Sequence, residues 1–188
     1  ATQGLRLEVI GDANDYVGKG LSGGTIIVRP SAAAAFVAHE NTIIGNTVLY
    51  GATSGKLFAA GQAGERLCVR NSGATAVVEG AGTNACEYMT GGRVVILGEV
   101  GDNFGAGMTG GMADVYDPDG TFVSRANPAS LEIVRIETAH WEADLKALVE
   151  AHAAATESAL AARLLNEWAV ERRRFWHIVP TEIVSRLE

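Results

Sequence analysis

The chain has 188 residues, a formal net charge of −7 and a hydrophobic fraction of 47%. This length is typical of one domain with a sizeable core. The acidic balance excludes nucleic acid and anionic membrane surfaces as partners, because both recruit clustered Lys and Arg side chains. No stretch approaches the roughly 20 apolar residues of a membrane span, and the first residues lack the pattern of a signal peptide. We therefore expect a cytoplasmic protein.

Glycine is abundant, with 23 residues, whereas aromatic residues make up only 6% of the chain. This composition favours an aliphatic core built from many short strands that are joined by tight turns. The two cysteines, Cys68 and Cys86, form no CxxC pair and no metal-binding cluster in the sequence. We expect reduced thiols that pack as small hydrophobic groups, and a disulfide between them is the less favoured alternative.

Short apolar and β-branched runs recur along the chain at a nearly constant interval. One series begins at Lys56, Thr75, Arg93 and Met112. A second series begins at Thr47, Arg66, Ala85 and Phe104. The step within each series is about 19 residues. Two series with one period indicate two faces of a coil that returns to the same face once per turn.

Glycine-rich segments separate the runs, and we interpret them as structural corners, because glycine readily adopts the positive φ angles of a tight turn. The corner glycines that we single out are Gly18, Gly20, Gly23, Gly24, Gly91, Gly92, Gly105, Gly107, Gly110 and Gly111. Together with the repeat, they predict a parallel β-solenoid over residues 1–136, with about 19 residues per rung. Cys68 and Cys86 would then stack on successive rungs. The alternative is an antiparallel sandwich, which does not require matching positions at a constant interval.

The glycine motif of residues 11–24 returns at residues 101–111, and in part at residues 88–92. Phosphate-binding loops have a similar glycine content, but each copy here precedes a predicted strand and not the start of a helix. The sequence also contains no GxxxxGK[ST] motif. The structural interpretation of these segments is therefore strongly favoured.

Residues 137–188 have a different composition, rich in alanine, leucine and charged residues. Their apolar residues step by three or four, which predicts a helix or a helix pair with one apolar stripe. The stripe consists of Trp141, Leu145, Leu148, His152, Leu160, Leu164 and Trp168. Thr156 and Ser158 are candidate caps of the second segment, and Arg172–Arg174 suit its carboxyl end. We expect these helices to close the solenoid, so that the whole chain is one structural domain.

Three segments carry a resemblance to a known family: Gly18 to Gly24, Asn46 to Thr53 and Gly105 to Gly111. They look like the carboxyl-terminal domain of the glutamate synthase large subunit, and the similarity covers nearly the whole chain. The resemblance implies a right-handed β-helix. It also implies that neighbouring domains cover part of its outside, which would account for continuous apolar runs such as residues 25–28. Asp114 departs from the family pattern, which has an aromatic residue there.

The resemblance also implies a function for the parent enzyme. Such an enzyme hydrolyses glutamine at an amino-terminal cysteine, passes ammonia to 2-oxoglutarate, and reduces the product at FMN with electrons from iron–sulfur clusters. We find no catalytic, cofactor-binding or metal-binding residue of that machinery in this chain. The expected role is a non-catalytic scaffold between the glutaminase domain and the FMN-binding synthase domain of the same parent chain. A small electron-delivering subunit is a further expected partner of the holoenzyme.

Two other functions remain as alternatives. The first is a partner subunit similar to the solenoid subunit of formylmethanofuran dehydrogenase, which shares the glycine periodicity but lacks the tail from Thr138 onward. The second is a stand-alone solenoid enzyme. A polysaccharide lyase needs a basic residue beside acidic metal ligands, and a hexapeptide acyltransferase needs a strict six-residue repeat with a catalytic His. Neither pattern is found in this sequence.

A few residues suggest chemistry but are better explained structurally. His39 and Glu40 could form an acid–base pair, yet a single His beside a Glu is more often a structural site. Asp12 and Asp102 occupy equivalent repeat positions, where we expect each carboxylate to cap backbone N–H groups. Arg172–Arg174 are too few to bind nucleic acid in an acidic chain, so a domain contact is the better functional interpretation. No role is assigned to Glu87 and Glu99.

Overall fold

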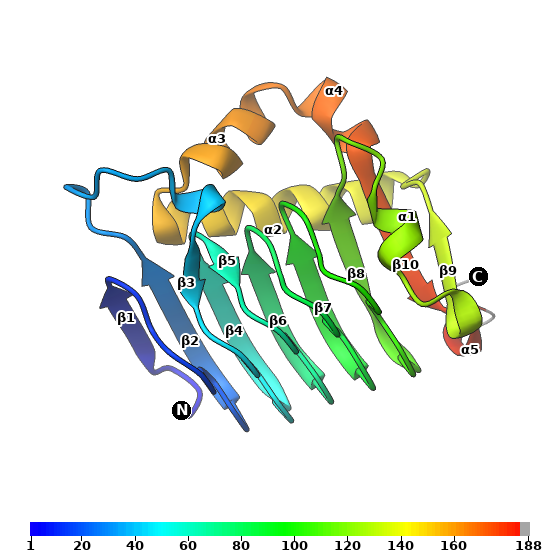
Figure 1. Cartoon of the computed structure of the whole chain (residues 1–188), viewed down its shortest axis with the longest axis horizontal. Helices are drawn as coiled ribbons and strands as arrows, with labels where there is room; N and C mark the ends of the chain where they lie inside the picture. The colour runs from blue at the N-terminus through cyan, green and yellow to red at the C-terminus, as the bar shows by residue number, and fades with distance from the viewer. Residues whose placement is uncertain (185–188) are drawn as a thin grey trace.

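The computed structural model describes residues 1–184 and shows a β-solenoid of about six turns, with helices that follow in the chain (Figure 1). The coil winds in the right-handed sense. Its main sheet contains the parallel strands β1 (Arg6–Ile10), β2 (Ser22–Arg29), β4 (Ser54–Ala59), β6 (Ser72–Val78), β7 (Thr90–Ile96) and β8 (Gly110–Tyr116). A second, two-stranded parallel sheet pairs β3 (Thr42–Ile44) with β5 (Gln62–Ala63). The predicted solenoid is therefore confirmed.

The rest of the chain adds helices and two antiparallel strands. The helices are η1 (Ala38–Glu40), α1 (Phe122–Arg125), η2 (Pro128–Ser130), α2 (Ala139–Thr156), α3 (Ala159–Asn166), α4 (Trp168–Glu171), η3 (Arg172–Arg174) and α5 (Thr181–Val184). Strands β9 (Leu131–Val134) and β10 (Phe175–Pro180) extend the main sheet in the order β1-β2-β4-β6-β7-β8-β10-β9. The region expected to be helical thus also contains β10, whose aromatic and β-branched residues favour a strand.

The strand register confirms the repeat of about 19 residues. Ile26 pairs with Leu57, which pairs with Ala76, and the same column continues through the later rungs to Ala113. The rung between β2 and β4 is longer than the others, because residues 30–41 leave the coil and include η1 before the chain returns. The side chains of this column point into the coil and form its core.

Each rung turns through three residues with left-handed backbone conformation at alternate positions. The first position is occupied by Tyr16, Thr47, Arg66, Asn84 and Asn103, with φ from 59° to 65°. The second is occupied by Gly18, Leu49, Cys68, Cys86 and Gly105, with φ from 57° to 71°. The third is occupied by Gly20, Gly51, Arg70, Tyr88 and Gly107, with φ from 54° to 65°. Only some of these positions have the glycine that this conformation favours, so the positions without glycine carry backbone strain.

The six other corner glycines lie in the first residues of strands. Gly23 and Gly24 belong to β2, Gly91 and Gly92 to β7, and Gly110 and Gly111 to β8. The pairing register shifts at each of these strand starts. At Gly91 and Gly110 a Cβ would collide with a backbone carbonyl of the preceding rung. These two glycines therefore allow close approach of successive rungs.

Cys68 and Cys86 occupy the same left-handed position on successive rungs, and both are fully buried. Both thiols are free. Burial raises the pKa of Cys86 to about 12 and raises that of Cys68 well above its ordinary value. Neither thiol ionises at neutral pH, so each packs as a small hydrophobic group.

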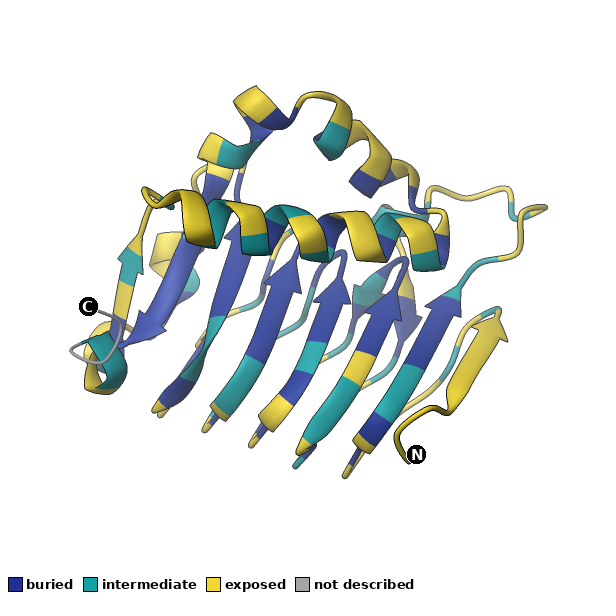
Figure 2. Cartoon of the chain, turned by 180° about the vertical axis from the view of Figure 1, so that it is seen from behind, coloured by how far each residue is buried: buried dark blue, intermediate teal, exposed yellow. Residues whose placement is uncertain are grey.

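The outer face of the main sheet is also apolar, and the chain covers it with its own helices. Ile27, Phe58, Val77 and Val95 point away from the coil and form a second core with α2 and α3. Helix α2 runs across the ends of the parallel strands, as Figure 2 shows. The continuous apolar runs therefore do not require neighbouring domains, contrary to what the family resemblance suggested. Each run has two buried faces within this chain.

At the left-handed positions we expect glycine to be more stabilising than alanine, which is the reverse of its effect inside a strand. At exposed Arg70, with φ 55°, we expect Arg70→Gly to be more stable than Arg70→Ala by about 1 kcal/mol, because glycine adopts this conformation without strain. At exposed Lys56, inside β4, we expect Lys56→Gly to be less stable than Lys56→Ala by roughly 0.5–1 kcal/mol. Urea unfolding of the four variants measures both differences. An Arg70→Gly variant less stable than Arg70→Ala would contradict the assignment.

Candidate functional site

The residues singled out from the sequence do not form a catalytic arrangement. His39 and Glu40 lie in η1, and the backbone oxygen of His39 accepts a hydrogen bond from Gln62 Nε2 at 3.0 Å. Among the described residues, the side chains of Asp12 and Asp102 make no hydrogen bond, so the expected capping by these carboxylates is wrong. Asp15 caps the neighbouring rung instead, because its Oδ1 accepts from the backbone N–H of Asn46 at 2.8 Å.

The tail arginines make contacts within the chain. Arg172 forms an ion pair with Glu142, with 2.5 Å between Nη1 and Oε2. Arg174 lies 3.3 Å from Glu171, whose carboxylate also accepts a hydrogen bond from Tyr116 at 2.6 Å. Ser158 caps α3 through a bond from Ala161 N–H, as expected, whereas the hydroxyl of Thr156 donates to the oxygen of His152. These bonds fasten the helical tail to itself and to β8.

The unexpected Asp114 is the centre of a buried polar network. It is fully buried on the outer face of β8, where it pairs with Val95 of β7 and His177 of β10. Its carboxylate forms an ion pair with Arg93 and lies 2.7 Å from Nδ1 of His177. Arg93 also bonds Asp144 of α2 at 2.7 Å. Asp114, which stands where the resemblance led us to expect an aromatic residue, therefore fits its buried polar surroundings.

This network joins three elements that are distant in sequence: β7, β10 and α2. Burial opposes the charge of Arg93, but Asp114 and Asp144 together raise the pKa of its guanidinium group. A buried ion pair is costly to break from one side, because the remaining charge stays desolvated. The Arg93–Asp114–His177 network therefore fixes how the tail lies on the sheet.

A second buried network lies at the end of β6. The Oε1 atom of Glu79 accepts a hydrogen bond from Ser158 and lies 3.1 Å from Nε2 of His152. The side chains of His152 and Glu79 are 0% and 1% exposed. Because Glu79 lies between the hydroxyl and the imidazole, the serine has no imidazole base. The arrangement is a junction between the sheet and the two helices, and not a nucleophilic triad.

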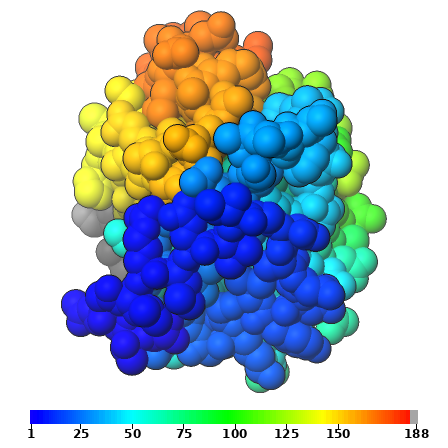
Figure 3. Space-filling view, turned by 90° about the vertical axis from the view of Figure 1, so that its left-hand side faces the viewer, coloured from blue at the N-terminus to red at the C-terminus, as the bar shows by residue number. Residues whose placement is uncertain are grey.

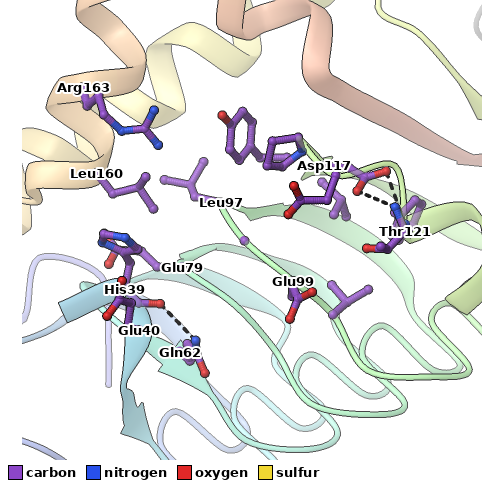
Figure 4. Close-up of a pocket in the computed structure, with 17 residues that line it drawn as sticks. His39, Glu40, Gln62, Glu79, Leu97, Glu99, Asp117, Thr121, Leu160 and Arg163 are labelled. Atoms are coloured by element: carbon purple, nitrogen blue, oxygen red, sulfur yellow. Dashed lines mark hydrogen bonds between the residues drawn. The ribbon is translucent and has the colours of Figure 1, made fainter. Parts of the chain in front are cut away.

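An open cavity lies beside this junction, above the carboxyl ends of β6, β7 and β8 (Figure 4). It has a volume of about 350 Å³. Carboxylates dominate its charged lining: Glu40, Glu79, Glu99, Asp117 and Asp119. The other ionisable side chains in the lining are Arg163 of α3, His39 and Tyr116. We call this space the acidic cavity. Glu99, which has no evident role in the sequence pattern, is part of it.

The two ends of the coil differ. At the carboxyl end, Ala113 pairs with Ile178 of β10, and Phe122 packs edge-on against Phe104 at 5.1 Å. At the amino end, Leu7 and Val9 of β1 continue the core columns of Ile26 and Val28. Yet Leu7 is 46% and Val9 39% exposed, whereas the residues beneath them are 8% and 0% exposed. Figure 3 looks onto this end.

Strand β1 is also the outermost strand of the main sheet, so one of its edges is unpaired. Leu5, which precedes β1, and Ile10, the last residue of β1, are 44% and 60% exposed. We call the surface formed by Leu5, Leu7, Val9 and Ile10 the open end. A solenoid needs its terminal rung covered, because both core and backbone groups are otherwise left in water.

Comparison with known proteins places the chain in a family. A family model described as the GXGXG motif matches residues 1–181. The chain belongs to the GXGXG motif family. In this chain, left-handed glycines alternate at one corner as Gly18 and Gly20 and again as Gly105 and Gly107.

The similar curated proteins are glutamate synthases. The large chain of the NADPH glutamate synthase of Azospirillum brasilense is 64% identical over 188 residues, which are 100% of this chain and 12% of that protein. A ferredoxin-dependent glutamate synthase of Arabidopsis thaliana is 52% identical over 94% of this chain and 11% of its own length. The NADH glutamate synthase of Schizosaccharomyces pombe is 50% identical over 98% of this chain and 9% of its own length. The GXGXG chain thus spans only a small part of each relative.

Replacing Asp114 tests the first buried network. We expect Asp114→Asn to lower the free energy of unfolding by about 3 kcal/mol, because Arg93 loses its buried counter-charge. Asp119→Asn is the matched control, since Asp119 is exposed, and its effect should stay within about 0.5 kcal/mol. Urea unfolding followed by circular dichroism measures both. Equal stability of the two variants would show that the network does not hold the tail.

Proposed function

We propose that this chain is the carboxyl-terminal scaffold domain of a glutamate synthase large subunit. The parent enzyme would convert glutamine and 2-oxoglutarate to glutamate, as an oxidoreductase of ammonia assimilation. Within it, this domain would carry no catalytic group and would hold the glutaminase and synthase domains together. The cytoplasmic location expected from the sequence belongs to the same proposal. Within residues 1–184, no helix combines the length and the apolar composition that a membrane span needs.

The open end is the observation that carries the proposal. It exposes the core columns of a coil whose other end is covered by its own chain. The GXGXG chain makes up 12% of the Azospirillum relative, so most of that protein lies outside the matched segment. An apolar surface at the end of a rigid coil is suited to permanent contact with such neighbouring segments.

The internal chemistry of the chain also supports a structural role. Its buried polar groups connect its own elements: Asp114 joins β8 to β7 and β10, and Glu79 joins β6 to α2 and α3. No group of three His, Cys, Asp or Glu side chains within residues 1–184 is arranged to hold a metal ion. The two thiols, Cys68 and Cys86, are buried within the coil.

The cofactors of the parent enzyme do not fit the residues of this chain. An iron–sulfur cluster requires several convergent thiolates, whereas burial strongly raises the pKa of both cysteines. The acidic cavity would repel the phosphate of FMN. We therefore assign FMN and the iron–sulfur clusters to other parts of the parent enzyme, together with any electron-delivering small subunit.

Complementation in trans tests the scaffold role. A large subunit truncated before this segment should lose glutamine-dependent glutamate formation and regain it when the GXGXG chain is supplied separately. Leu7→Glu with Val9→Glu should weaken docking at least about tenfold, because two charges replace apolar contacts at the open end.

Val123→Glu with Val134→Glu is the control, since these side chains are 49% and 44% exposed away from the open end. The control pair should restore activity like the unmodified chain. Circular dichroism and urea midpoints verify that both double variants remain folded. Full activity of the truncated subunit alone would contradict a required scaffold. If the Leu7/Val9 variant restored as much activity as the unmodified chain, the open end would be excluded as the docking surface.

A further inference from the structure

A second cavity lies on the outer face of the last two strands of the main sheet. Strands β10 and β9 end that sheet on the side opposite β1, and His177 of β10 pairs there with Val134 of β9. The space above this pair has a volume of about 380 Å³, which is within the range of ligand pockets. The lining residues that matter here are Val134, Ile136, Trp141, His177, Val179 and Val184. We call this space the β10 cavity.

His177 directs an unused hydrogen-bonding atom toward the β10 cavity. Its side chain is only 6% exposed, and within residues 1–184 its Nε2 atom has no hydrogen-bond partner. Its other ring nitrogen, Nδ1, lies 2.7 Å from Oδ1 of Asp114 on β8. The two nitrogens of an imidazole point in nearly opposite directions, so Nε2 is directed away from β8. Strand β9 lies on that side of β10, and Val134 of β9 is part of the cavity lining.

The partners of Asp114 determine the role of this unused atom. Asp114 is ionised, because it forms a buried ion pair with Arg93. A carboxylate only accepts hydrogen bonds, so Nδ1 of His177 carries the proton and donates it to Asp114. In that tautomer Nε2 is an acceptor with a free lone pair. A buried acceptor without a donor is costly, so a ligand that brings an N–H or O–H group would stabilise the arrangement.

The rest of the lining favours a flat, apolar ligand. The ring centroids of Trp141 and His177 are 5.6 Å apart, with an interplanar angle of 31°. These two rings form an aromatic wall, and such a wall makes its best contacts with another aromatic ring. Val134 and Val179 supply an apolar floor beside it. The cavity therefore combines one buried acceptor with surfaces that attract an aromatic ring.

The charged residues of the lining disfavour an anion. The permanent cation among them is Arg135, which is engaged elsewhere: its Cζ lies 3.4 Å from the ring centroid of Trp176, and its Nη1 donates to the oxygen of Phe175 at 3.0 Å. Glu132 and Glu137 are exposed at the rim, where they would repel a carboxylate or a phosphate. A metal ion would need further ligands beside His177, and the part of the chain that the structure describes groups no three suitable side chains.

We propose that the β10 cavity binds a small, uncharged aromatic molecule with an N–H or O–H donor. The ring of this molecule stacks on Trp141, and its donor bonds Nε2 of His177. Indole is a simple compound of this class. The cavity lies at the opposite end of the main sheet from the open end, so we assign its occupant to free solution and not to the domain that docks there. The site is thus a function in addition to the scaffold role.

Titration with a matched pair of probes tests the hydrogen bond to His177. Indole and benzofuran have nearly the same shape, but benzofuran has an oxygen where indole has its N–H donor. Binding to the GXGXG chain is followed by NMR through the backbone amides and the nitrogen chemical shift of Nε2. We expect indole to bind about tenfold more tightly than benzofuran. Indole should also move the Nε2 resonance upfield, as an acceptor does when it gains a donor.

Three variants locate the site. Trp141→Ala should weaken indole binding at least about tenfold, because the stacking surface is lost. Tyr88→Ala is the matched control, since Tyr88 is a 54% exposed aromatic residue outside the cavity lining, and it should leave binding unchanged. His177→Phe keeps a ring but removes the acceptor, so it should bind indole and benzofuran equally. Urea midpoints verify folding, and if His177→Phe is unfolded, the Nε2 shift of the unmodified chain decides the same point.

Each contrary result overturns a stated part of the proposal. Absence of saturable indole binding overturns the site. Equal affinity of the unmodified chain for the two probes, or an unchanged Nε2 resonance, overturns the hydrogen bond to His177. Competition between indole and docking of the chain to the truncated large subunit would identify a side chain of the neighbouring domain as the occupant, which overturns a free ligand. The titration does not involve docking, so its result is independent of the scaffold role.

Discussion

Every rung of this protein depends on a backbone turn with three left-handed residues at alternate positions. This turn brings the chain back to the main sheet after about 19 residues and stacks each rung on the previous one. Glycine relieves the strain at positions such as Gly18 and Gly105, whereas Leu49, Cys68 and Cys86 carry it in the middle rungs. Those three side chains are fully buried, so the hydrophobic contacts that they gain offset the unfavourable conformation.

A coil built in this way has apolar side chains on both faces of its main sheet. The helical tail buries those on the outer face. Helices α2 and α3 cover the outer face and create the second core. Apolar contacts alone would allow the helices to slide along a uniform surface. The networks around Asp114 and Glu79 add directional bonds between fixed partners, so they specify one position of the tail on the sheet.

The same construction leaves the two ends of the coil unlike. The open end is apolar and has an unpaired strand edge, whereas β10 and Phe122 cover the other end. Burial of an apolar surface supplies much of the energy of association between proteins. A rigid coil with such an end would fix the relative position of larger domains, which is the role that we propose in a glutamate synthase.

The sequence by itself determined the solenoid, its period and the helices at its end, because these follow from local spacing: apolar runs at a constant step, glycines between them, and a stripe at helical intervals. It did not determine what covers the outer face, that residues 175–180 form a strand, or which carboxylates act together. Glu79 meets His152 and Ser158, and Arg93 meets Asp114 and His177, only when distant elements pack. Side-chain partners across such separations leave no periodic signal, so only the tertiary structure decided them.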